Sequence, residues 1–263
     1  MGWFTRNKWG VEHAVFVAAS AATVVGGVLG NESVQKIAKP LIAPSLAVRV
    51  LRRSRDLDRA DTALLLAGLT AATVGDMFMI DPDDDSRILR GAGAFAVMQT
   101  SYSTLLARHG ARPTRTAVLQ RVPAVLGAAG LLGWRSRSVA APLTAYGTLL
   151  ATTATLAADP SLAPGAKTSG GLVLPNADRR SWPGADRRSW PGADRRSWPG
   201  ADRRSWLCLG GLVFTLSDGT IVERRTLLKN KSARAAAEGF VLATYAAAQL
   251  LLVEGMLALG RRT

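Results

Sequence analysis

Residues 60–80 read ADTALLLAGLTAATVGDMFMI, a run of 21 residues in which only Asp61 and Asp76 are charged. An α-helix of about 20 mostly apolar residues is long enough to cross the hydrocarbon core of a bilayer. Asp61 lies at the start of the run, whereas Asp76 lies inside it, four residues before its end at Ile80. Ionisable side chains at such depth are costly and commonly face a polar interior site. The stretch therefore predicts a membrane-spanning helix that carries a buried carboxyl group.

Similar apolar runs recur along the whole chain. They predict an all-α integral membrane protein of the cell membrane, with about eight transmembrane helices and the lipid bilayer as its partner. The alternative, a soluble protein with buried apolar helices, is disfavoured because the runs have no polar face to show to water. The second run contains Lys36 and Lys39, and the fifth is interrupted by Arg121 and Pro123. The predicted spans are 11–30, 34–51, 60–80, 88–107, 116–134, 138–158, 207–222 and 235–259.

The charge distribution supports this interpretation. A net charge of +14 is compatible with nucleic-acid binding or with basic loops beside a membrane. Because the Arg and Lys residues lie between the apolar runs, the second explanation is favoured and no nucleic-acid partner is expected. The one cysteine, Cys208, excludes a disulfide framework within the chain. The sequence carries no signature of an oligomeric state.

The longest connection contains a tandem repeat, ADRRSWPG, which begins at Ala177 and ends in a shortened fourth copy at Trp206. Each copy has a single large apolar side chain, too little buried area to offset the entropy of ordering the backbone. We therefore expect a disordered or lipid-associated loop without a role in the chemistry. One membrane domain then has three segments: residues 1–158 with spans one to six, 159–206 with the loop, and 207–263 with spans seven and eight.

The two halves of the chain share short motifs in the same order. KPLIA (39–43) in the second span matches APLTA (141–145) in the sixth, and TVGD (73–76) in the third matches TLSD (215–218) in the seventh. This pattern predicts a parallel duplication of four spans plus four, a type of internal repeat known in membrane proteins.

Asp76 and Asp218 are the candidate catalytic residues. Asp218 lies four residues before the end of the seventh run at Val222, as Asp76 does in the third. The two spans run in the same direction, so both carboxyl groups are expected about 6 Å inside one face, with Lys39 near them. Alternatively, each acid reaches the membrane surface or pairs with Lys39 to hold helices together. A small residue, Gly75 or Ser217, precedes each acid and would leave room for a ligand. Further polar side chains are expected deeper in the same region: Gln99, Tyr102, Tyr146, Tyr245 and Gln249.

The residue types limit the chemistry. Neither of the two histidines, His13 and His109, lies among these helix positions, so no metal site and no histidine-activated nucleophile are expected. No phosphate-binding glycine loop occurs and no cofactor is expected. Two carboxyl groups remain, and they suit general acid and base catalysis, because a pocket of low dielectric lets an acid keep its proton. Acid-assisted hydration of an electron-rich double bond fits this set of groups.

Five stretches give the chain a resemblance to the YhhN family of membrane proteins, which includes the lysoplasmalogenases. They are KPLIAPSL (39–46), VGDMFMI (74–80), GAGAFAVMQTSY (91–102), FTLSDGTI (214–221) and YAAAQLLL (245–252). The resemblance implies an eight-helix membrane enzyme that hydrolyses the vinyl ether bond of a lysophospholipid. The products would be a fatty aldehyde and glycerophosphoethanolamine or glycerophosphocholine.

The resemblance also implies roles for individual residues. Asp76 and Asp218 match the family's acids that are needed for activity, and Lys39 matches the lysine of its K-P motif. Lys39 would hold the lipid phosphate or adjust an acid, and the polar residues named above would support the substrate. Gln99 stands where family members often have histidine, and its amide cannot carry protons as imidazole does. The competing hypothesis is a membrane transporter or binder of lipids or small solutes that performs no hydrolysis.

Overall fold

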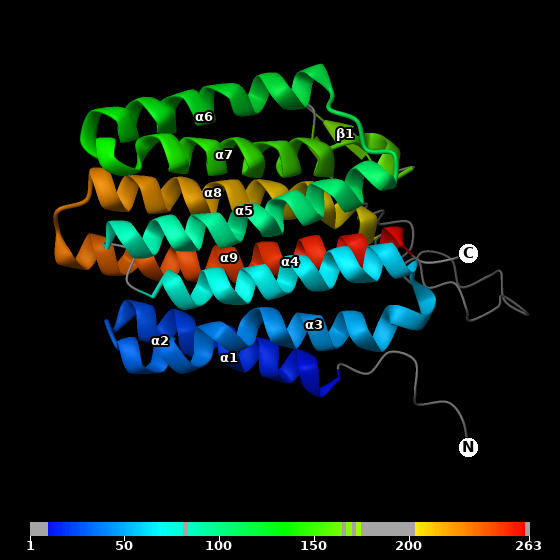
Figure 1. Ribbon diagram of the computed structural model, residues 1–263, viewed down its shortest axis with the longest axis horizontal. Helices are drawn as coiled ribbons and strands as arrows, with labels where there is room; N and C mark the ends of the chain where they lie inside the picture. The colour runs from blue at the N-terminus through cyan, green and yellow to red at the C-terminus, as the bar shows by residue number, and fades with distance from the viewer. Residues whose placement is uncertain (1–9, 81–83, 165–166, 170–171, 175–202, 261–263) are drawn as a thin grey trace, which may run out of the picture.

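The computed structural model describes residues 10–80, 84–164, 167–169, 172–174 and 203–260 of the 263-residue chain. These residues form a bundle of roughly parallel helical rods, which the chain traverses back and forth (Figure 1). The α-helices are α1 (Val11–Val28), α2 (Glu32–Ala38), α3 (Ile42–Arg53), α4 (Arg59–Phe78), α5 (Asp85–Arg108), α6 (Arg115–Arg135), α7 (Arg137–Ala157), α8 (Trp206–Thr226) and α9 (Lys231–Leu259). A turn of 3-10 helix, η2 (Ser54–Asp56), precedes α4.

Each predicted span coincides with helical structure, with one correction. The second span, predicted as one helix over 34–51, consists of α2, the 3-10 turn η1 (Lys39–Leu41) and α3. Pro40 accounts for the break, because proline has no N–H to donate and its ring clashes with the carbonyl four residues earlier. Pro123 and Pro142, in contrast, lie inside α6 and α7, which continue past them.

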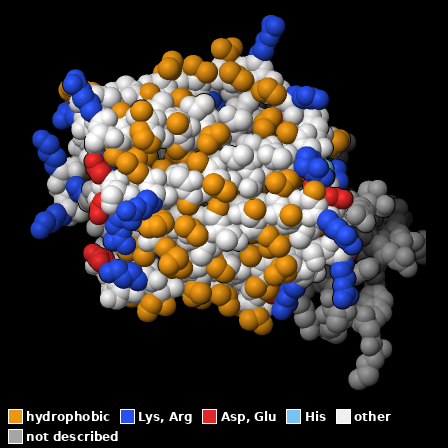
Figure 2. All heavy atoms as spheres, viewed as in Figure 1, with side chains coloured by type: hydrophobic (Ala, Val, Ile, Leu, Met, Phe, Trp, Pro, Cys, Tyr) orange, Lys and Arg blue, Asp and Glu red, His pale blue; other side chains and the backbone are white. Residues whose placement is uncertain are grey.

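The surface of the bundle is that of a protein embedded in lipid. Hydrophobic side chains cover the middle of the face shown in Figure 2, and Lys and Arg gather toward its two ends. Leu119 and Leu126 of α6, for example, are 71% and 65% exposed. Five of the described helices are long and apolar enough to cross a membrane: α1, α6, α7, α8 together with η5 (Arg203–Ser205), and α9. The larger count of eight spans stays a prediction.

Small residues allow the central helices to approach closely. A Cβ atom on Gly211 of α8 would lie 2.9 Å from the Cα of Ala154 in α7, and one on Gly75 of α4 would lie 2.9 Å from ring atoms of Phe95 in α5. Helices in a membrane associate largely through such tight packing, because lipid leaves no hydrophobic driving force between them. The two helices that carry the predicted acids are thereby held firmly in the bundle.

The loop segment predicted over 159–206 is described only in part. Its described residues form the 3-10 turns η3 (Pro160–Leu162) and η5, and the strands β1 (Lys167–Ser169) and β2 (Leu172–Leu174). The two strands pair antiparallel and are the departure from an all-helical fold among the described residues. Most of the repeat falls on 175–202, outside the described residues, so its predicted disorder is not tested. The four-plus-four duplication also stays a prediction.

Candidate active site

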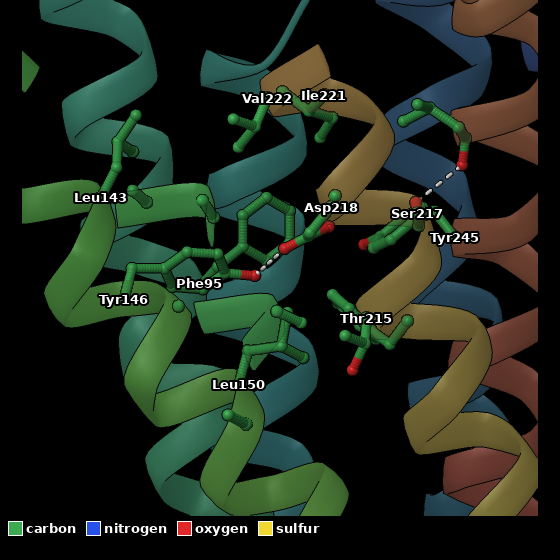
Figure 3. Close-up of a pocket in the computed structure, with 18 of the residues that line it drawn as sticks. Phe95, Leu143, Tyr146, Leu150, Thr215, Ser217, Asp218, Ile221, Val222 and Tyr245 are labelled. Atoms are coloured by element: carbon green, nitrogen blue, oxygen red, sulfur yellow. Dashed lines mark hydrogen bonds between the residues drawn. The ribbon is translucent and has the colours of Figure 1, made fainter. Parts of the chain in front are cut away.

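Asp218 projects from α8 toward α7, where it meets Tyr146 (Figure 3). The Tyr146 hydroxyl donates a hydrogen bond to Asp218 Oδ2 over 2.5 Å. Asp218 and Tyr146 are both half-buried. The bond joins two different helices, so it fixes the direction in which the carboxyl group points.

Asp76 projects from α4 and is fully buried. The Tyr245 hydroxyl, from α9, donates to Asp76 Oδ2 over 2.9 Å, while Oδ1 accepts no hydrogen bond from the described residues. Two aromatic rings, Phe95 and Phe214, contact the Tyr245 ring edge-on with centroids 5.8 Å away in both cases. The ring of Tyr245 is therefore held in place, and one oxygen of Asp76 is left for a ligand or water.

A chain of hydrogen bonds supports the Asp76 pair from behind. Gln249 Nε2 donates to the Tyr245 hydroxyl over 3.2 Å, and the Tyr102 hydroxyl donates to Gln249 Oε1 over 3.1 Å. Tyr102 and Gln249 are fully buried. Each of the chain's three tyrosines thus belongs to this network or to the Asp218 pair.

Both carboxyl groups line one cavity of about 160 Å³. Tyr146, Tyr245 and Lys39 also line it, and most of the remaining wall is apolar. The wall on α6 is built largely from small side chains, and the lining residues of that helix are Arg121, Ala124, Val125, Ala128, Ala129 and Leu132. Polar groups are therefore concentrated at the two acids of an otherwise apolar chamber, a pattern typical of ligand sites.

The predicted depths of the acids need a correction, because the helices end elsewhere than predicted. Asp218 lies eight residues before the end of α8 at Thr226, and Asp76 lies two residues before the end of α4 at Phe78. Helix α8 extends beyond α4 at that end of the bundle (Figure 1). This stagger offsets the difference between the two acids in their distance from the helix end. The structure thus brings both acids to the same cavity.

Three of the predicted support residues interact mainly with groups other than the two acids: Lys39, Ser217 and Gln99. Lys39 interacts electrostatically with Asp76, but its Nζ donates to the Met79 carbonyl over 2.7 Å. The Ser217 hydroxyl donates to the Val241 carbonyl over 3.0 Å, which ties α8 to α9 (Figure 3). The buried amide of Gln99 interacts with Tyr146 without a hydrogen bond of ordinary geometry. Of these three side chains, Lys39 and Ser217 line the cavity.

Arg121 is a cavity residue that the sequence analysis treated only as an interruption of the fifth span. Its side chain is 5% exposed and lines the cavity from α6. A basic residue in the middle of an apolar run was the signal that could have identified it, since charges inside membrane helices usually face an interior path.

Comparison with known proteins identifies the family. The YhhN family model matches residues 34–179 and 186–256, a range that includes both acids, Lys39 and the three tyrosines. No curated protein and no solved structure matches the chain. Among the described residues, no three His, Cys, Asp or Glu side chains gather where a metal ion could be held. Since the matched residues make up most of its length, the chain belongs to the YhhN family.

Proposed function

We propose that this membrane protein is a hydrolase of the lysoplasmalogenase type, which cleaves the vinyl ether bond of a lysophospholipid. The observation that carries the proposal is the pair of tyrosine-bound carboxyl groups, Asp76 and Asp218, in one apolar cavity of the bundle. Hydration of a vinyl ether needs one group that gives a proton to carbon and one that takes a proton from water. Two carboxyl groups that line one cavity can fill both roles.

Asp218 is the proposed acid. Its proton goes to the β-carbon of the vinyl ether, the double-bond electrons form the new C–H bond, and an oxocarbenium ion remains at the carbon attached to oxygen. The Tyr146 hydroxyl holds Oδ2 of Asp218, so that the other oxygen is directed to the substrate. The apolar wall keeps bulk water away from this cation and confines the reaction to a positioned water molecule.

Asp76 is the proposed base. Its carboxylate takes a proton from water as the water oxygen bonds to the oxocarbenium carbon, which gives a hemiacetal. Lys39 interacts electrostatically with Asp76 and suits an ionised partner. Asp76 then returns its proton to the departing glycerol oxygen while the Asp218 carboxylate takes the proton of the hemiacetal hydroxyl. The products are a fatty aldehyde and a glycerophospho-alcohol, and both acids regain their starting state.

The test is aldehyde release from a lysoplasmalogen by purified protein in detergent, with Asp76→Asn and Asp218→Asn as variants. General acid–base groups contribute about 10²–10⁴-fold, so each variant should lose at least about a hundredfold in kcat. Asp84→Asn is the matched control: Asp84 caps α5 at the surface, and asparagine caps helices equally well. Turnover at the wild-type rate in both site variants would end the proposal. Release in detergent also separates hydrolysis from transport, because transport needs a sealed vesicle.

A further inference from the structure

Arg121 is a buried cation whose hydrogen-bonding capacity is mostly unused. Its Nη1 donates to the carbonyl of Ala117, one turn earlier in α6, over 2.8 Å, whereas Nε and Nη2 are buried without a hydrogen-bond partner among the described residues. Among the described residues, the side chain that interacts electrostatically with Arg121 is Cys208, and no carboxylate does so. A buried donor left unpaired costs about 1–3 kcal/mol, and more when it is charged. The arrangement indicates an anionic ligand.

The position of Arg121 indicates a path by which such a ligand passes from the surface of the bundle to the cavity of the two acids. A second hollow, of about 400 Å³, lies between α6 and α7, and it shares Arg121, Val125 and Ala151 with the cavity of the two acids. Its other lining residues are apolar or threonine, for example Val122 and Thr152. Thr152 is exposed, and so is Leu126, which lines the same hollow. Arg121 therefore lies at the junction between a surface groove of the lipid-facing bundle and the chamber that holds the acids.

The alternative cation at the cavity, Lys39, is less suited to bind an anion. Its Nζ already donates to the Met79 carbonyl, and it interacts with the negative charge of Asp76. Arg121 has no carboxylate in its surroundings that competes for it among the described residues. A guanidinium also offers a planar set of donors that matches the oxygens of a phosphate.

We propose that Arg121 binds the phosphate of the lysophospholipid, an assignment that rests on the proposed function and deepens it. The acids' cavity, about 160 Å³, is smaller than the roughly 300–1,000 Å³ that a drug-sized ligand occupies, so it holds only part of a lipid. With the phosphate at Arg121, the glycerol and its vinyl ether extend along the small residues of α6 toward Asp218 and Asp76. Arg121 then sets the position of the scissile bond relative to the acids.

Binding of uncleavable lipids tests this assignment without relying on hydrolysis. The probes are a saturated ether lysophosphatidylcholine, the corresponding alkylglycerol without phosphate, and inorganic phosphate. Affinities are measured by calorimetry on purified protein in one detergent, for the wild type, Arg121→Gln, Arg121→Lys and the control Arg137→Gln. Arg137 is an exposed arginine at the start of α7, outside both hollows.

The expected result is a loss of about tenfold or more in the affinity of Arg121→Gln for the phospholipid, with no change for the alkylglycerol. Arg121→Lys should retain part of the affinity, and the control all of it. Equal losses for both lipids, or no loss, would overturn the assignment. The wild type alone provides a second test that needs no variant: it must bind the phospholipid more tightly than either the alkylglycerol or inorganic phosphate. If binding depends on the phosphate but the protein releases no aldehyde, the assignment of Arg121 stands and only the proposed hydrolase activity is refuted.

Discussion

Tyr146→Phe removes the hydroxyl that donates to Asp218 Oδ2 over 2.5 Å and keeps the aromatic ring. The Asp218 carboxyl group becomes negatively charged as its proton moves to the substrate, and a hydrogen bond to a charged group contributes about 1.5–3 kcal/mol. Because 1.36 kcal/mol corresponds to a factor of ten in rate, kcat for aldehyde release should fall by about tenfold to a hundredfold. KM should change little, since Tyr146 positions the acid rather than the lipid phosphate. Stability should also change by less than about 1 kcal/mol, because Asp218 is only half-buried.

Tyr102→Phe is the matched control, since it makes the same chemical change in the same bundle. The Tyr102 hydroxyl donates to Gln249 Oε1 over 3.1 Å, in a fully buried position that does not line the cavity. Its loss leaves a buried amide oxygen without this donor, which should lower the free energy of unfolding by about 1–3 kcal/mol. The value of kcat should fall less than in Tyr146→Phe, because Gln249 and Tyr245 separate the Tyr102 hydroxyl from Asp76. Tyr146→Phe is thus expected to lose more activity, and Tyr102→Phe more stability.

Both properties can be measured on the same preparations. Initial rates of aldehyde release over a range of lysoplasmalogen concentrations give kcat and KM, and thermal unfolding in the same detergent gives the order of stability. Wild-type kcat in Tyr146→Phe would refute the argument that this hydroxyl orients the acid. A kcat loss in Tyr102→Phe as large as that in Tyr146→Phe would show that the effect does not depend on direct contact between the hydroxyl and an acid.

Two further predictions concern the scaffold. Gly211→Val should lower stability by about 1–3 kcal/mol, because its Cβ would lie 2.9 Å from the backbone Cα of Ala154. Gly130→Ala is the control and should not lower stability in the same thermal measurement, because its Cβ meets open space and alanine favours a helix. Deleting residues 177–200 removes three complete copies of the octapeptide. The deletion should leave kcat unchanged, because the proposed site lies in α4, α7, α8 and α9. A large loss of aldehyde release would show that the repeat takes part in function.

The helices and the two acids could be predicted from the sequence because both are local signals. An apolar run of the right length is a property of neighbouring residues, and a carboxyl group within it stands out against that background. The break at Pro40 was also within reach, since proline interrupts the helical hydrogen-bond pattern wherever it stands. Arg121 carries the same kind of signal, because it is a charge within an apolar run.

The partners of those acids were not predictable in the same way. Tyr146 and Asp218 are 72 positions apart, and Tyr245 and Asp76 are 169 positions apart. Which helices lie side by side depends on the fit of small residues such as Gly211 against a neighbouring backbone. The sequence does not show which apolar helix faces fit together, because many of them have similar composition.

The sequence by itself therefore determined the helical character of this protein and the presence of two acids within its apolar helices. The tertiary structure decided that both acids face one cavity and that each is held by a tyrosine from another helix. It also placed Arg121 in the wall of that cavity, with two of its nitrogens unpaired among the described residues. The physical reason is that hydropathy acts over a single helix, whereas a hydrogen bond between helices exists only once side-chain packing has set their order, stagger and rotation.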